Sequence, residues 1–133
     1  MKLNKQQYKE ENCRYLNDNQ SKPDMVCLPS GLQYRVIKMG EGIQPVPTSL
    51  VHVYYEGKFI DQRVFDANLT EPFPALLRVF EVIDGWKEAL LLMREGSEFE
   101  IVVPFELGYG KKKVDNIPGY STLLFRIQLL KVE

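Results

Sequence analysis

The sequence contains few of the side chains that enzymes use as nucleophiles, general bases or metal ligands. It has one histidine, His52, and two cysteines, Cys13 and Cys27. Neither a cysteine–histidine zinc cluster nor a histidine-based carboxylate metal site can be assembled from that set, so we expect no metal and no cofactor. A serine or cysteine hydrolase would have to use His52, whose neighbours Val51 and Val53 indicate a strand and a structural role. The two cysteines fit either a disulfide or, more simply, two free thiols.

The overall charge and the apolar runs exclude two further classes of protein. The 133 residues carry 17 Lys and Arg against 18 Asp and Glu, a formal net charge of -1. Nucleic-acid affinity rests on many basic contacts to phosphate, so we expect no nucleic-acid partner. The longest apolar run, residues 89–93, is far too short to cross a bilayer, so we expect no membrane association. No apolar segment follows the first two residues, which predicts a cytoplasmic protein, or a periplasmic or exported one whose signal was removed.

The first 24 residues differ in composition from the remainder. They are polar, and Tyr8, Tyr15 and Leu16 form a thin apolar stripe at i, i+7 and i+8 of a helix. Pro23 ends that pattern. We therefore divide the chain into a short N-terminal helical arm, residues 1–24, and a domain, residues 25–133. The arm is expected to pack weakly or fray on a monomer, although its stripe also fits a dimer contact or the remnant of a larger N-terminal module.

Residues 25–133 show the patterns of several strands and one helix. Four apolar residues at i, i+3, i+4 and i+7 predict a helix over 84–93, with Asp84 as its N-cap. They are Trp86, Ala89, Leu90 and Met93. Strands flanking a single helix favour the α+β class, here a twisted antiparallel β-sheet wrapped around one short α-helix. Alternating or β-rich segments predict these strands at 32–39, 50–60, 63–65, 72–79, 97–103 and 121–132.

Six short motifs occur in one order along residues 28–133. They read LPSGLQY at 28–34, VYYEG at 53–57, VFD at 64–66, EVIDGW at 81–86, LGYG at 107–110 and IPGYSTLLF at 117–125. In order and spacing they resemble the FKBP-type peptidyl-prolyl cis-trans isomerase family, in its bacterial branch related to macrophage infectivity potentiators. The chain departs from the family pattern at Gln62, where a turn glycine is common, and at Asn116 in the loop before the last strand. The resemblance implies an FKBP-like fold and an isomerase that assists protein folding.

The resemblance also implies a site, residue by residue. Asp66, Tyr109 and Tyr55 match the family's polar, catalytic positions. Trp86 matches the indole that lies under the proline ring, and the backbone N–H of Ile83 matches a hydrogen-bond donor. Proline-containing unfolded or flexible polypeptides are the implied substrates, and rapamycin or tacrolimus the implied inhibitors. The remaining substrate-binding positions are Phe65, Val82, Ile83, Phe73, Ile117 and Phe125.

The available side chains fit the chemistry of that family. Rotation about an X-Pro bond faces a barrier of about 18–20 kcal/mol because amide resonance is lost. No bond is cut, so neither a nucleophile nor a metal is needed, and a dry aromatic pocket favours the less polar twisted amide. Two hypotheses follow. The chain is an isomerase or, as the alternative, a non-catalytic or weakly catalytic chaperone module that binds proline-containing segments.

Overall fold

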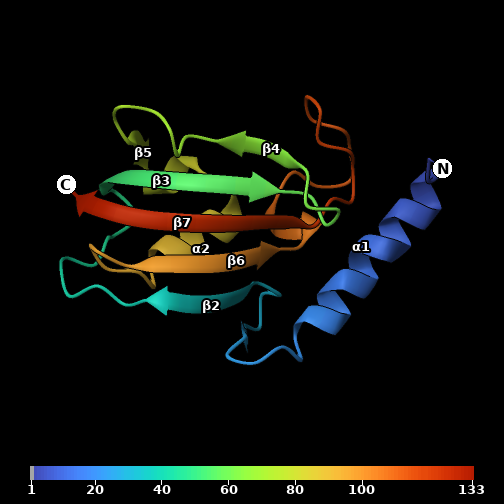
Figure 1. Cartoon of the computed structure of the whole chain (residues 1–133), viewed down its shortest axis with the longest axis horizontal. Helices are drawn as coiled ribbons and strands as arrows, with labels where there is room; N and C mark the ends of the chain where they lie inside the picture. Colours follow the sequence, from blue (N-terminus) through green and yellow to red (C-terminus); the bar gives the residue numbers. More distant parts are fainter. Residues whose placement is uncertain (1) are drawn as a thin grey trace.

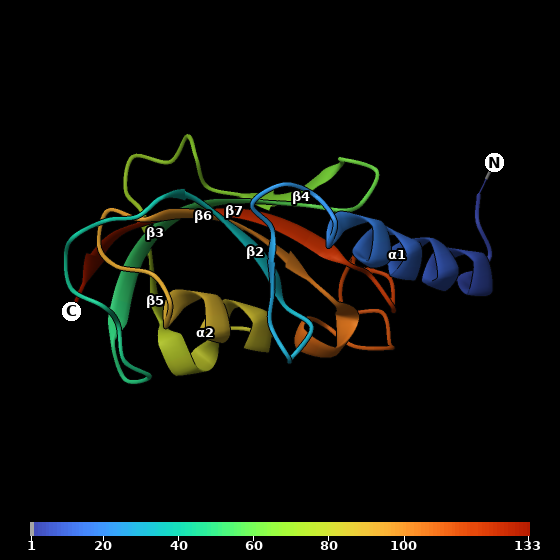
Figure 2. The same ribbon diagram turned by 90° about the horizontal axis from the view of Figure 1, so that it is seen from below.

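The computed structural model describes residues 2–133, and in this part of the chain a curved antiparallel sheet encloses one short helix (Figures 1 and 2). The sheet has seven strands in the order β1-β2-β6-β7-β3-β4, with β5 paired to β3. The predicted α+β arrangement is therefore confirmed. The strands are β1 Val26–Cys27, β2 Gln33–Lys38, β3 Leu50–Lys58, β4 Val64–Ala67, β5 Ala75–Arg78, β6 Glu98–Val103 and β7 Leu123–Val132. The helices are α1 Lys5–Asn19 and α2 Asp84–Leu90, with 3-10 turns η1 Val79–Glu81 and η2 Phe105–Leu107.

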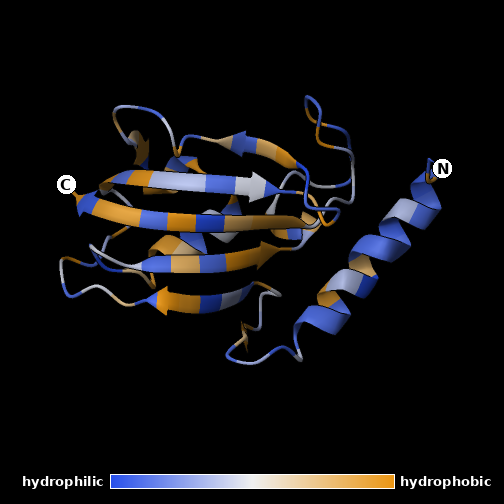
Figure 3. Ribbon diagram, viewed as in Figure 1, coloured by the Kyte–Doolittle hydropathy of each residue, from blue (hydrophilic) through white to orange (hydrophobic). Residues whose placement is uncertain are grey.

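Alternation along β7 shows how the sheet makes a core. Leu123, Ile127 and Leu129 are at most 1% exposed, and Phe125 is 5% exposed. The residues between them point to the outer face, where Arg126 is exposed. Figure 3 shows the same alternation of apolar and polar residues along the strand. Because β7 pairs with both β6 and β3, its buried side chains join the two halves of the sheet over α2.

Helix α2 lies on the concave side of the sheet (Figure 2), and both of its ends differ from the prediction. Ile83 is the N-cap, with φ -60° and ψ 154°, and no side chain caps the helix. The prediction of Asp84 as N-cap is wrong, because Asp84 is already helical and its carboxylate lies 3.4 Å from Lys87 Nζ. In this first turn the helix dipole stabilises the negative charge. The helix ends at Leu90 and not at Met93, because the N–H groups of Leu92 and Met93 bond three residues back in a tighter turn.

Helix α1 lies outside the sheet, beside β2 and the loop that precedes β7 (Figure 1). A capping box fixes its start: the Asn4 side chain accepts from the Gln7 N–H at 2.8 Å, and the Gln7 side chain accepts from the Asn4 N–H at 3.0 Å. Figure 3 shows that α1 is polar along most of its length. The predicted apolar stripe is only partly buried, and the two buried residues of the helix are Asn12 and Asn19. Polar contacts therefore dock the arm.

Candidate functional site

A hollow of about 280 Å³ opens at the N-terminal end of α2, between that helix and strands β3, β4 and β7. Five separate parts of the chain contribute to it, at residues 55, 65–66, 77–86, 109 and 125, so the sheet must be complete before the hollow exists. Most of its lining is aromatic or aliphatic. The lining residues are Tyr55, Phe65, Asp66, Leu77, Glu81, Val82, Ile83, Trp86, Tyr109 and Phe125.

Trp86 and the aromatic rings around it form the apolar floor and walls. The Trp86 indole is 5% exposed, and it meets two rings edge-on. Its centroid lies 5.2 Å from that of Tyr55 at 87° and 5.4 Å from that of Phe125 at 86°. Phe65 meets Phe125 in the same way, at 5.6 Å and 77°. Edge-to-face pairs are favourable contacts, so these rings hold one another in place as an apolar box.

Gly57 on β3 allows the walls to close. A Cβ at this position would lie 2.7 Å from Phe125 Cε1 and 2.9 Å from Phe65 Cζ, closer than real Cβ atoms come to carbon. The two rings therefore pack directly over the β3 backbone. The glycine of the VYYEG motif is explained by this close approach of ring and backbone.

Two phenols and one carboxylate supply the polar groups of the hollow. The Tyr55 hydroxyl donates to Asp66 Oδ2 at 2.8 Å. Burial raises the pKa of Tyr55 well above its ordinary value, and the hydrogen bond to the Asp66 carboxylate raises it further. Burial also raises the pKa of Tyr109, with smaller contributions from the charges of Asp66 and Asp115. Both phenols therefore keep their protons at neutral pH.

The Tyr109 hydroxyl is the donor that the site leaves available. In the part of the chain that the structure describes, the Tyr55 hydroxyl is bonded to Asp66, whereas no hydrogen bond of the Tyr109 hydroxyl is found. An apolar box with one such donor at its side suits a ligand that combines an aliphatic ring with a neighbouring carbonyl.

The structure brings together eight of the ten residues that the sequence analysis assigned to a site. Phe73 does not line the hollow: it is 79% exposed in the turn before β5. Ile117 does not line it either, because its side chain is 7% exposed and belongs to the core. Two lining residues were missed, Leu77 and Glu81. Glu81 is the first residue of the EVIDGW motif, and its place in that motif could have identified it as a lining residue.

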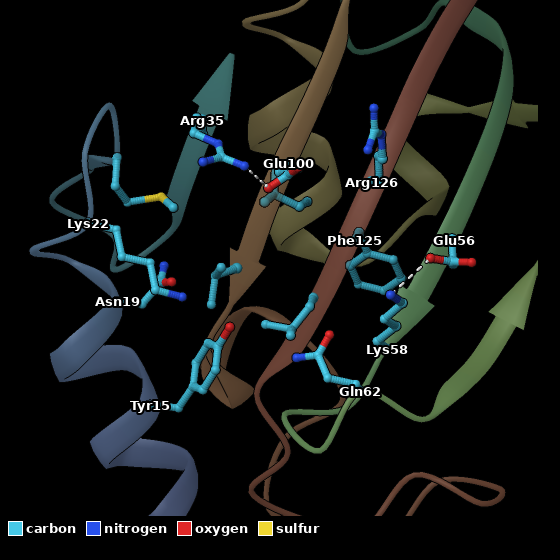
Figure 4. A pocket seen from close by; sticks show the side chains of 14 residues that line it. Tyr15, Asn19, Lys22, Arg35, Glu56, Lys58, Gln62, Glu100, Phe125 and Arg126 are labelled. Atoms are coloured by element: carbon cyan, nitrogen blue, oxygen red, sulfur yellow. Dashed lines mark hydrogen bonds and ion pairs between the residues drawn. The ribbon is translucent and has the colours of Figure 1, made fainter. Parts of the chain in front are cut away.

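A larger cavity of about 360 Å³ lies between α1 and the outer face of the sheet (Figure 4). Most of its charged side chains form ion pairs. Arg35 Nη2 lies 2.7 Å from Glu100, and Lys58 Nζ lies 3.4 Å from Glu56. Arg126 also forms an ion pair, with Glu98. Because these cations and anions are paired along the outer face of the sheet, we regard this cavity as a solvated sheet surface and place the chemistry in the aromatic hollow.

The remaining candidates for chemistry lie apart from the hollow. His52 Nε2 lies 2.7 Å from a carboxylate oxygen of Glu133, at the far end of β3, which fits the structural role. Cys13 and Cys27 are exposed free thiols, so the disulfide alternative is not realised. Between residues 2 and 133, no group of three or more His, Cys, Asp or Glu side chains is arranged to hold a metal ion.

Comparisons with known proteins agree on one family. The sequence model of the FKBP-type peptidyl-prolyl cis-trans isomerase family matches residues 41–130, and that of the domain amino terminal to FKBP-type peptidyl-prolyl isomerase matches residues 1–36. The chain is 45% identical to the FKBP-type 22 kDa peptidyl-prolyl cis-trans isomerase of Escherichia coli strain K12, over 92% of this chain and 60% of the relative. It is 45% identical to the outer membrane protein MIP of Legionella longbeachae, over 90% of this chain and 52% of the relative.

A solved structure has the same fold. The crystal structure of FkpA from Escherichia coli matches with a TM-score of 0.91 at 34% identity, over 95% of this chain and 59% of that one. The chain thus spans between about half and three fifths of the length of these three relatives.

Proposed function

The chain belongs to the FKBP-type peptidyl-prolyl cis-trans isomerase family, and we propose that its aromatic hollow accelerates rotation about X-Pro bonds in unfolded or flexible polypeptides. One observation carries the proposal: in one hollow, the buried Trp86 indole meets the Tyr55 and Phe125 rings edge-on, and the Tyr109 side chain lines the same hollow. No observation favours the alternative of a non-catalytic binding module.

The geometry supports a mechanism without covalent chemistry. The proline ring lies on Trp86, and the apolar walls remove water from the amide. A planar amide is more polar than a twisted one, so water stabilises the ground state and a dry site favours the twisted state. Tyr109 donates to a carbonyl of the substrate. The Asp66 carboxylate holds the Tyr55 hydroxyl in place and sets the electrostatic field at the amide.

A protease-coupled assay on Leu-Pro and Phe-Pro peptides tests the function. We expect catalysed cis-to-trans conversion at micromolar protein, and loss of that activity on adding rapamycin or tacrolimus, the inhibitors proposed for this hollow. A folded protein that leaves the uncatalysed relaxation of tens to hundreds of seconds unchanged would show that the function is wrong.

Replacing Tyr109 with phenylalanine deletes one hydroxyl and keeps the ring. A neutral hydrogen bond is worth about 0.5–1.5 kcal/mol net, and 1.4 kcal/mol is about tenfold in rate, so we expect kcat/KM to fall by no more than about tenfold. Tyr54→Phe is the matched control, because the Tyr54 hydroxyl bonds to the Glu71 carbonyl outside the hollow. Equal rates for the two variants would remove Tyr109 from the mechanism.

The raised pKa values of Tyr55 and Tyr109 predict the alkaline part of the pH profile. A phenol whose pKa is raised on folding stays neutral up to and beyond the ordinary value of 10.0, so its hydrogen bonds persist there. The stability that the neutral phenols contribute is lost only above that pH. We expect kcat/KM to stay level between about pH 7 and about pH 9.5. A fall with a midpoint below about pH 9 would show that a group of lower pKa controls the reaction.

The organisation and location of the whole protein are also proposals. We propose the division into an arm of residues 1–24 and a domain of residues 25–133, and a monomer that sedimentation at high micromolar concentration would test. Within residues 2–133 no helix has the length and apolarity needed to cross a membrane. The expected cytoplasmic location gains no support from the relatives, since one of them is named an outer membrane protein. Cell fractionation distinguishes the cytoplasm from the cell envelope.

A further inference from the structure

We propose that α1 positions Tyr109, because it anchors the loop of residues 108–122 that carries this side chain. The inference rests on the proposed isomerase function. It assigns Asn12 and Tyr8 as positioning residues, which act through Tyr109 and touch no substrate. Figure 1 shows the N-terminal half of α1 beside this loop.

Asn12 is the centre of the contact between helix and loop. It is 1% exposed, and its side-chain oxygen accepts from the Thr122 N–H at 2.7 Å. Its amide group donates to the Tyr8 carbonyl at 2.7 Å, and its own carbonyl accepts from the Thr122 hydroxyl at 3.2 Å. The two bonds to Thr122 are directional and buried, so they fix one position of the loop end relative to the helix.

Tyr8 adds a second bond to the same loop. Its hydroxyl lies 2.7 Å from Ser121 Oγ. The Ser121 hydroxyl donates to the Pro118 carbonyl at 2.7 Å, so Tyr8 is the donor in the first bond. The helix thereby bonds directly to Ser121 and Thr122 and, through the Ser121 hydroxyl, is linked to Pro118.

The other end of α1 is tied to the sheet. Asn19 is 2% exposed and donates to the Gln33 side chain at 2.7 Å, and Gln33 donates to the Leu16 carbonyl at 2.9 Å. Gln33 is the first residue of β2. The C-terminal end of α1 is therefore bonded to β2, and its N-terminal half is bonded to the loop.

A short series of contacts leads from the anchored end of the loop to Tyr109. The Tyr120 ring has Lys9 Nζ of α1 4.8 Å from its centroid, and it packs edge-on against Phe105 at 4.8 Å. The Tyr120 N–H donates to the Gly110 carbonyl at 3.0 Å. The Phe105 carbonyl accepts from Gly108 at 3.1 Å and from Gly110 at 3.0 Å, the two neighbours of Tyr109.

The loop needs such an anchor because its backbone is strained. Tyr120 has φ 67° and Asp115 has φ 52°, values that residues with a side chain rarely adopt. Gly108 and Gly110 add freedom on both sides of Tyr109. A loop of this kind keeps one geometry only where its surroundings impose it.

A double-mutant cycle between Asn12 and Tyr109 tests the inference. We expect Asn12→Ala to lower kcat by up to about tenfold with little change in KM. The variant can lose at most the rate acceleration that the hydrogen bond from the Tyr109 hydroxyl contributes. In a Tyr109→Phe background, Asn12→Ala should cause no further loss. Asn17→Ala is the control: the same change, on the exposed side of the same helix, should leave kcat unchanged.

Losses that multiply in the double variant, or equal rates for Asn12→Ala and Asn17→Ala, would overturn the proposal. If Asn12→Ala does not fold, Tyr8→Phe takes its place in the cycle, because that substitution deletes only a hydroxyl. Hydrogen exchange of the Gly110 and Tyr120 amides gives a readout besides activity, and Asn12→Ala should accelerate it where Asn17→Ala does not. An inactive wild-type protein would refute the proposed function, whereas unchanged exchange in Asn12→Ala would refute the anchoring.

Discussion

Asp66→Leu is expected to slow isomerisation at least tenfold, more than Tyr109→Phe, and to leave measurable activity. Asp66 lines the hollow although it is exposed, and a full charge there acts on the amide more strongly than a neutral dipole does. Its removal also leaves the Tyr55 hydroxyl without the acceptor that lies 2.8 Å away. Leucine keeps the site apolar, so the rings around Trp86 still exclude water and some acceleration remains.

The measurement is kcat/KM on a Phe-Pro peptide, with thermal unfolding to confirm the fold. Asp18→Leu is the control, because Asp18 is an exposed carboxylate near the end of α1 and far from the hollow in sequence. Complete loss of activity in Asp66→Leu at unchanged stability would point to acid–base chemistry. An unchanged rate would show that this carboxylate takes no part.

Trp86→Leu is expected to lower kcat/KM by about tenfold or more and to destabilise the fold as well. The indole forms two edge-to-face pairs, with Tyr55 and Phe125, each worth about 0.5–1.5 kcal/mol. Truncation of a buried tryptophan to alanine costs about 3–5 kcal/mol, and leucine should cost less because it fills part of the space. The proposed floor under the proline ring nevertheless loses its flat surface.

Urea unfolding and the peptide assay on the same sample separate the two effects. Trp86→Phe is the graded comparison, since it keeps a flat ring and should retain more activity than Trp86→Leu. A Trp86→Leu protein that is folded and fully active would contradict the assignment of the indole as the floor.

The strands and the lining of the hollow follow from patterns that the sequence displays. The alternation along residues 121–132 predicts which side chains of β7 face α2, and Phe125 reaches the hollow for that reason. The EVIDGW motif places Val82, Ile83 and Trp86 at the start of the helix, where they line the hollow. Regular elements are predictable because one periodicity fixes many side chains at once.

The loops and the arm were less predictable, and the reasons are physical. Phe73 and Ile117 lie in irregular segments, where no periodicity fixes the direction of a side chain. Gln62 adopts φ 75°, a value that favours glycine; the glycine common at this position of the family pattern indicates it, whereas the glutamine itself does not. Hydrophobic periodicity also could not find Asn12 and Asn19, because the docking face of α1 is made of hydrogen bonds. Hydrogen bonds of this kind can be recognised only when the positions of both the helix and the segment that it contacts are known.

Exchange spectroscopy by NMR, on labelled protein with a Phe-Pro peptide, tests the central claim most directly. The sequence has one tryptophan, so the indole N–H signal belongs to Trp86 without further assignment. We predict catalysed exchange between the cis and trans peptide signals, with an indole shift that saturates at the same peptide concentration as the rate. Catalysed exchange with an unmoved indole signal would place the reaction elsewhere, and no exchange above the uncatalysed rate would contradict the proposed function.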